Sequence, residues 1–176
     1  MDILDFSDCE LYFEEPLLPE AERLLQEASG LYGDEAAELA LLRAYVLAPE
    51  HLTVLVGLYR YYFYQHRLED ALVVAERAMQ LVARRLGLPL DWARVEELHL
   101  AAAAQSSFGL LRFYLLALKA SCVVLLRQHA IDAARARLQK LMRLDSQDQL
   151  GAAKLLEVVD EFRPRQEAEP ALTLIA

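Results

Sequence analysis

Apolar residues recur along most of this chain every three or four positions, the spacing that places them along one side of an α-helix. The clearest example is the stripe formed by Leu68, Leu72, Ala75, Met79 and Val82. No segment alternates apolar and polar residues with β-branched side chains over the length of a strand, so the pattern predicts no β-sheet. The sequence therefore predicts an all-α protein.

Prolines, glycines and capping residues divide this pattern into seven or eight antiparallel helices. Pro19 is expected to begin the first helix and Gly30 to end it, while Asp34 and Asp91 are expected N-caps. The predicted helices cover residues 19–30, 35–47, 51–66, 68–86, 92–104, 110–128, 131–144 and 147–162. Residues 106–109, Ser-Ser-Phe-Gly, either separate the fifth helix from the sixth or lie inside one long helix over 92–128.

The length of 176 residues suits a single domain with a sizeable core. We expect an acidic N-terminal segment over residues 1–17 and a helical domain over residues 18–162. The remaining residues, 163–176, contain Pro164 and Pro170 and are expected to form a frayed C-terminal tail.

Large and small residues repeat at matched positions in three stretches of the chain. The stretch that starts at Leu52 places Leu55, Leu58, Tyr59, Tyr62, Ala71, Ala75 and Ala78 at these positions. The preceding stretch, from Leu18, places Leu24, Ala37, Leu41, Ala44 and Pro49 there. The third stretch, from Leu115, places Leu118, Cys122, Leu125, Ala134, Leu138 and Leu141 there. Over residues 18–162 the chain resembles the tetratricopeptide-repeat family, in which 34-residue helical hairpins stack because one hairpin cannot bury its own apolar stripe.

The resemblance implies a superhelix of hairpins with an irregular insertion around residues 86–114, and it has two departures. Tyr59 stands where the family favours Gly or Ala, and the insertion does not fit the repeat period. A generic solenoid of helical hairpins is the alternative fold.

In this family the first helix of each hairpin lines a concave groove, so the resemblance also implies a binding surface. The residues expected on it are Thr53, Val56, Arg60, Phe63, Tyr64, Lys119, Val123 and Arg127. Aromatic and arginine side chains commonly anchor protein interfaces, and the cations would favour an acidic peptide or protein surface. The predicted function is a protein–protein interaction module, either an adaptor or an accessory, chaperone-like protein. The alternative is that these residues only pack on the next hairpin or form a solvated basic face.

The formal net charge is −9, which disfavours nucleic-acid binding because phosphate backbones repel an acidic protein. The charge is uneven: the first 50 residues hold 13 acidic and 2 basic residues, whereas residues 108–143 hold 1 acidic and 7 basic residues. This asymmetry keeps a self-associating scaffold, with a homodimer as its simplest form, among the alternatives. The acidic segment itself is expected to fold back into the groove, to dock on a neighbouring subunit, or to remain a frayed start.

Candidate chemistry is sparse, and we expect no enzyme, metal or cofactor. The one metal-like spacing is Glu96 with His99, which leaves a ligand- or metal-handling bundle as a further alternative. Cys9 and Cys122 lie far apart and form no redox or metal-binding motif, which fits a cytoplasmic protein. The apolar run over residues 108–126 contains Arg112 and Lys119, so it predicts a buried helix and no membrane span.

Overall fold

A computed structural model describes residues 15–31 and 33–168 of the chain, and within these ranges it contains helices and no strand. The predicted all-α class is therefore confirmed for the described part of the chain. The helices are α1 (Pro19–Gly30), α2 (Glu35–Leu47), α3 (Leu52–Tyr64), α4 (Leu68–Leu86), the 3-10 helix η1 (Trp92–Arg94), α5 (Glu97–Ser106), α6 (Phe108–Arg127), α7 (Ile131–Leu144) and α8 (Ala152–Ala168).

The bounds of α1, α2, α4 and α7 agree with those predicted from the sequence, and local signals account for several of them. The side chain of Asp34 accepts a hydrogen bond of 3.1 Å from the backbone N–H of Ala36 at the start of α2. Gly87 follows α4 with φ of +67°, a left-handed conformation that glycine adopts without steric cost. The third helix is slightly shorter than the expected 51–66.

The fifth helix begins later than predicted. Asp91 caps only the single 3-10 turn of η1, and the chain then extends through Val95 and Glu96 before α5 starts. Val95 is fully buried, so tertiary packing holds this residue out of a continuous helix. Residues 97–106 therefore form α5 in place of the predicted 92–104.

The break between the fifth and sixth helices lies at Ser107, so the single-helix alternative over 92–128 is wrong. Ser107 is extended, with φ of −160°, and its Oγ accepts a hydrogen bond of 3.3 Å from the N–H of Leu110. Helix α6 consequently begins at Phe108, two residues before the predicted start, and ends at Arg127.

The eighth helix is shifted toward the C-terminus relative to the predicted 147–162. Two carboxylates hold the preceding residues in a loop: Asp145 accepts from the N–H of Leu150 at 2.8 Å, and Asp148 accepts from that of Ala153 at 3.1 Å. The backbone of residues 163–168, predicted to be part of the tail, continues α8. The predicted N-terminal segment up to residue 14 and the tail from residue 169 lie outside the described residues.

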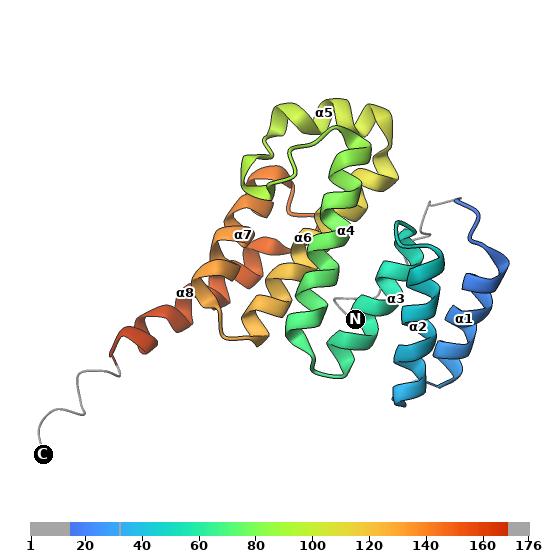
Figure 1. Ribbon diagram of the computed structural model, residues 1–176. Coiled ribbons are helices and arrows are strands. Elements are labelled where there is room, and N and C mark those ends of the chain that lie inside the picture. The colour runs from blue at the N-terminus through green and yellow to red at the C-terminus, as the bar shows by residue number, and fades with distance from the viewer. Residues whose placement is uncertain (1–14, 32, 169–176) are drawn as a thin grey trace, which may run out of the picture.

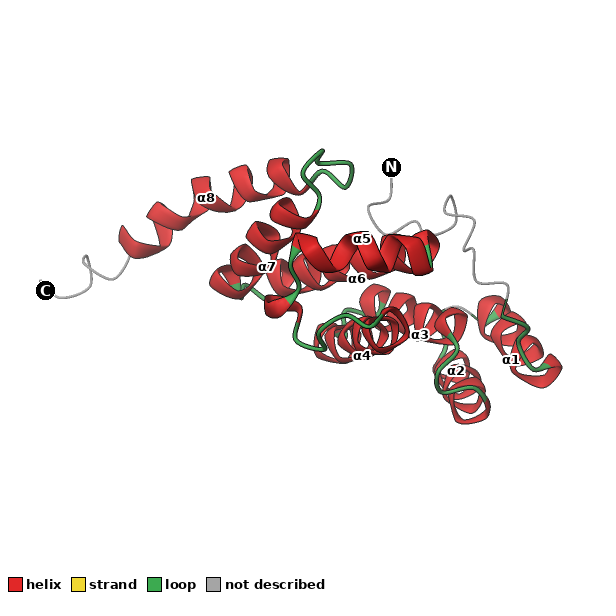
Figure 2. Cartoon of the chain, turned by 90° about the horizontal axis from the view of Figure 1, so that it is seen from above, coloured by secondary structure: helices red, strands yellow, loops and turns green. Residues whose placement is uncertain are grey.

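The helices pack as consecutive hairpins that follow one another across the molecule (Figure 1). Helix α1 pairs with α2, α3 with α4, and α6 with α7, while α2 contacts α3, α4 contacts α6, and α8 covers α7. The inserted α5 lies against α6 and α7, and Figure 2 shows it above α6. One continuous apolar core runs through the stack from Ala21 to Val159.

Small residues allow the hairpins to approach closely. Ala37, Ala71 and Ala134, near the starts of α2, α4 and α7, are each fully buried. Gly57 in α3 faces the first hairpin, and a Cβ atom there would lie 3.1 Å from a methyl carbon of Leu41. A larger side chain at position 57 would push the first two hairpins apart.

Helix α6 is long and apolar enough to cross a membrane by length and composition alone. However, 56% of its most apolar window is buried inside the protein, where it contacts α4, α5 and α7. A core helix of a soluble protein meets the same criterion, so this property alone is weak evidence for a membrane span.

Candidate partner-binding surface

The α3–α4 and α6–α7 hairpins are built alike at a spacing of 63 residues. Gln65 and His66 end the first helix of one hairpin, and Gln128 and His129 end the first helix of the other. Both histidines adopt the left-handed conformation, with φ of 58° and 59°. The following residue closes each turn with a 2.9 Å backbone hydrogen bond, from Arg67 to the carbonyl of Tyr62 and from Ala130 to that of Leu125. Helices α3 and α6 therefore occupy equivalent places in successive hairpins.

The repeated Gln-His pair was not used in the sequence analysis, although it lies in the sequence at the same spacing as Ala71 and Ala134. Histidine is an uncommon choice for a left-handed position, where glycine is usual. A search for matched turn residues as well as matched helix residues would have identified this equivalence.

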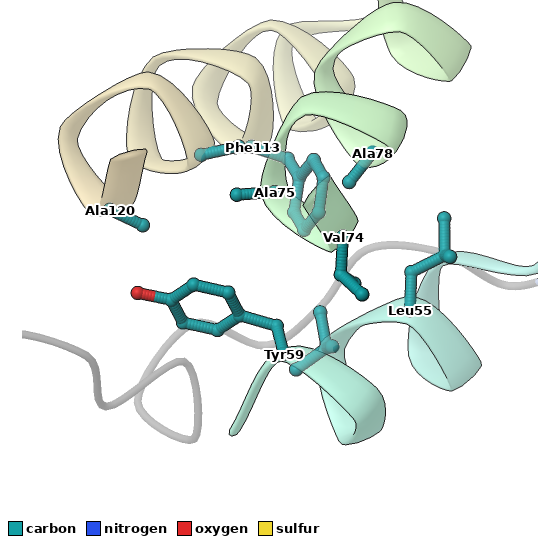
Figure 3. Close-up of a pocket in the computed structure, with 9 residues that line it drawn as sticks. Leu55, Tyr59, Val74, Ala75, Ala78, Phe113 and Ala120 are labelled. Atoms are coloured by element: carbon teal, nitrogen blue, oxygen red, sulfur yellow. The ribbon is translucent and has the colours of Figure 1, made fainter. Parts of the chain in front are cut away.

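The wall between α3 and α6 is apolar and tightly closed at its centre (Figure 3). A cavity of about 20 Å³ remains there, room for a single water molecule. Its lining residues are Leu55, Val56, Tyr59, Val74, Ala75, Ala78, Phe113, Ala117 and Ala120. Figure 3 shows the rings of Tyr59 and Phe113 on opposite sides of this gap. Among the predicted partner-binding residues, Val56 lines the cavity.

Phe63 and Arg127, predicted independently on two helices, lie in direct contact. The guanidinium carbon of Arg127 is 4.5 Å from the centre of the Phe63 ring, a cation–π arrangement. Arg127 also donates a 2.7 Å hydrogen bond to Nδ1 of His66. Phe63 is only 6% exposed, so it supports Arg127 from beneath and is not an open apolar anchor.

Lys119 lies on the side of α6 that faces the loop before α8. Its Nζ donates a hydrogen bond to the backbone carbonyl of Leu150. Burial lowers the pKa of this lysine, with the nearby carboxylates of Asp148 and Asp145 acting in the opposite direction. Lys119 therefore ties α6 to the C-terminal loop and does not extend over the wall between α3 and α6.

The other predicted residues lie around this wall with intermediate or high exposure. Thr53, Arg60 and Val123 are half-buried, and Tyr64 is exposed. Thr53, Arg60 and Tyr64 are spaced by seven and four residues, so they share one face of α3. Neither Arg60 nor the exposed Arg112 forms an ion pair with a carboxylate of the described residues.

The Glu96–His99 pair has a structural role at the start of α5. Nδ1 of His99 accepts a 3.0 Å hydrogen bond from the backbone N–H of Glu96, which satisfies a donor at the helix terminus. Within residues 15–31 and 33–168, no group of three or more His, Cys, Asp or Glu side chains is close enough to hold a metal ion.

Cys122 is buried, and its thiol donates a 3.2 Å hydrogen bond to the carbonyl of Leu118. Burial raises the pKa of this thiol to about 12, so the nucleophilic thiolate is scarce at neutral pH. The arrangement offers no activated nucleophile at this position.

Two buried cations of α7, which the sequence analysis did not identify, fasten the insertion that precedes α6. Lys140 donates a 2.9 Å hydrogen bond from Nζ to the carbonyl of Val95. Arg137 lies 5.2 Å from the centre of the Trp92 ring and forms an ion pair with Glu76 of α4. Their side chains thus hold η1 and the extended residues after it against the last hairpin.

Comparisons with known proteins give one informative similarity. No family model matches the sequence, and no solved structure matches it. A relative from Azotobacter chroococcum mcd 1, described as an uncharacterized 19.8 kDa protein in the nifW 5′ region, is 47% identical over 161 residues. The matched residues make up 92% of this chain and 90% of the relative.

Proposed function

The chain belongs to the family of this 19.8 kDa protein from Azotobacter chroococcum, and we propose that it is a protein–protein interaction module of tetratricopeptide type. In this proposal it acts as an adaptor or accessory protein, and a segment of its partner binds along the wall formed by α3 and α6. The two widely spaced cysteines, Cys9 and Cys122, form no motif of a secreted disulfide framework, and we propose a cytoplasmic location.

The observation that carries the proposal is the recurrence of one hairpin at a spacing of 63 residues. The turn after α3 and the turn after α6 share their sequence pair, their left-handed histidine and their closing hydrogen bond. Helices α3 and α6 both line the central cavity together with α4, and stacked hairpins commonly present their equivalent helices to a partner.

The charges around the wall support an acidic partner. Arg60 and Arg127 form no ion pair with a carboxylate of the described residues, and Phe63 holds the guanidinium of Arg127 in place. A pre-positioned arginine loses little conformational entropy when it binds a carboxylate. The central cavity admits one water molecule, so the partner would lie across the wall, between these arginines, without inserting a large side chain.

The local chemistry of the described residues favours binding over catalysis. The Cys122 thiol has a raised pKa, and the His99 ring nitrogen caps a helix, so neither is arranged as a nucleophile or base. The gene of the relative lies in the nifW 5′ region, which makes the product of nifW one candidate partner to include in a binding assay.

The test compares the chain with two charge-matched double variants as baits for capture from a cell lysate. Arg60→Glu with Arg127→Glu reverses two charges at the wall, whereas Arg94→Glu with Arg143→Glu reverses two exposed charges elsewhere. Helix content and melting temperature are measured first, so that only folded baits are compared. We expect the wall variant to lose specific partners that the control variant retains. Equal capture by all three baits would place the binding surface elsewhere.

A further inference from the structure

The first hairpin has an open apolar groove on the side that faces away from the rest of the stack. The groove has a volume of about 540 Å³ and lies between α1 and α2. Its residues are Glu20, Arg23, Leu24, Leu39, Leu42, Arg43, Val46 and Leu47. Leu39 is 51% exposed, Leu42 40% and Val46 78%, so the apolar part of the groove is largely uncovered.

Helix α2 is apolar on two opposite faces. Ala37, Ala40, Leu41 and Ala44 are buried in the core. Leu39, Leu42 and Val46 follow one another at spacings of three and four residues, which places them on the opposite side of the helix. A helix that is apolar all round is usually buried on both faces. At the other end of the stack, by contrast, α8 covers α7.

We propose that this outer groove of the first hairpin is a homodimer interface, covered in solution by the same hairpin of a second copy. Two helical hairpins that meet face to face form a four-helix bundle, and each buries the apolar stripe of the other. In a twofold contact of this kind each copy uses the same surface, so no surface remains for a third copy. The contact therefore yields a dimer and does not extend into a filament. The proposal concerns a different surface from the wall of α3 and α6 and does not depend on it.

The charges beside the groove favour a second copy as the occupant. The first 50 residues contain only two basic residues, Arg23 and Arg43, and both lie at this groove. Glu20, also at the groove, and Glu35, on the same face of α2 as Leu39 and Leu42, are exposed acidic residues. Arg23 already pairs with Glu20 and Glu27 of its own helix, whereas Arg43 forms no ion pair with a carboxylate of the described residues. A second copy supplies exposed glutamates for Arg43, and these contacts offset part of the repulsion between the two acidic hairpins.

The size of the groove predicts a weak dimer. Helix α2 has 13 residues, which corresponds to a length of about 20 Å. We expect a contact between two such short hairpins to bury less than the roughly 1,600 Å² of a standard stable interface. The dimer is therefore expected to dissociate on dilution within the micromolar range.

The test is sedimentation velocity on the full chain between about 1 and 200 μM, a range that covers micromolar dissociation constants. We expect the sedimentation coefficient to rise with concentration from that of a monomer to that of a dimer. Leu42→Glu with Val46→Glu should weaken the dimer by about tenfold or more, because it places charges in the apolar centre. Val73→Glu is the matched control, since Val73 is 67% exposed on α4 outside the groove and its replacement should leave association unchanged.

A second measurement locates the contact directly. In a Cys9→Ser background, Val46→Cys chains should be joined by a short bismaleimide cross-linker, and Val73→Cys chains should not. A wild-type chain that remains monomeric over the whole range overturns the proposal. The proposal is also overturned if Leu42→Glu with Val46→Glu leaves the dimer unchanged and high salt dissociates it. That result would indicate association through the separate acidic and basic regions of the chain.

Discussion

The α3–α4 and α6–α7 hairpins share one backbone design but distribute side-chain volume differently. Ala71 and Ala134 occupy equivalent, fully buried positions near the starts of α4 and α7. One and two turns later, Ala75 and Ala78 of α4 correspond to Leu138 and Leu141 of α7. Both alanines line the narrow cavity between α3, α4 and α6, where a leucine would collide with the closely packed α6. The repeated backbone thus leaves the size of each side chain to be set by the neighbouring helix.

The two hairpins also differ in what the side chains at two equivalent positions contact. The positions of α4 equivalent to Arg137 and Lys140 hold Val74 and Arg77. In α7 the two cations hold the insertion through Trp92 and the carbonyl of Val95. The last hairpin therefore carries polar contacts to the inserted segment, while its turn matches that of the α3–α4 hairpin.

The substitutions with the largest expected effect test whether the two hairpins contribute equally to the stability of the core. Leu55 and Leu118 are equivalent residues that are 1% and 0% exposed. Leu55→Ala and Leu118→Ala should each lower the free energy of unfolding by about 2–5 kcal/mol, because each leaves a cavity. Urea unfolding measures both, with the exposed Val73→Ala as a control expected to change stability by less than about 0.5 kcal/mol. A cost below about 1 kcal/mol for only one of the two leucines would contradict a shared core design.

A somewhat smaller effect is expected from the cation that distinguishes α7. Arg137→Met removes the ion pair with Glu76 and the contact with Trp92. We expect a loss of about 2 kcal/mol, because the hydrogen-bonded ion pair is lost but the remaining Glu76 is partly exposed and leaves no buried unpaired charge. Urea unfolding measures the loss, and Trp92 fluorescence reports on the insertion. An unchanged emission spectrum in the folded variant would show that Arg137 does not hold η1 in place.

Alkaline pH should destabilise the last hairpin through Tyr114 of α6. Burial raises the pKa of Tyr114 to about 12, with Asp91 acting in the same direction. Between pH 10 and pH 12 the unfolded chain loses this proton while the folded chain retains it, so stability falls as the pH rises. One pKa unit corresponds to about 1.4 kcal/mol, which gives a loss of about 2 kcal/mol from this group.

Thermal unfolding of the wild type and of Tyr114→Phe across this pH range checks the prediction. The variant should lose less stability between pH 10 and pH 12 than the wild type. Tyr62, whose pKa is also raised to about 12, supplies a remaining dependence on pH in both proteins. Parallel stability curves for the two proteins would show that Tyr114 does not carry the effect.

The smallest expected effect lies in the matched turns. A left-handed conformation costs a non-glycine residue about 1–2 kcal/mol, and glycine avoids this at an entropic cost of about 0.5–1 kcal/mol. His129→Gly should therefore stabilise the protein by about 0.5 kcal/mol. His66→Gly should gain less, since it also removes the 2.7 Å contact with Arg127. Differential scanning calorimetry of the two variants measures which substitution stabilises the protein more. An equal gain in stability at both turns would mean that the contact between His66 and Arg127 contributes nothing to stability.

Features of the candidate partner-binding surface that depend on contacts between helices were only partly predictable. The repeat register placed Val56, Phe63 and Arg127 on one predicted groove; in the structure Val56 lines the central cavity and Arg127 lies over the ring of Phe63, and their role in binding stays a prediction. It did not reveal that Lys119 bonds to the carbonyl of Leu150 or that Phe63 is covered by Arg127. A long side chain can reach toward either neighbour, and only the packed neighbours determine which contact forms.

The sequence by itself determined the all-α class, the bounds of α1, α2, α4 and α7, and the small residues at which hairpins approach. These features are local, since capping side chains, glycine and proline act within a few residues of their own position. Tertiary structure alone decided the late start of α5 after the buried Val95, the loop before α8 and the buried cations that hold the insertion. Each of these depends on groups distant in the chain or on how a loop is packed, because a buried polar group requires a partner that no periodicity in the sequence identifies.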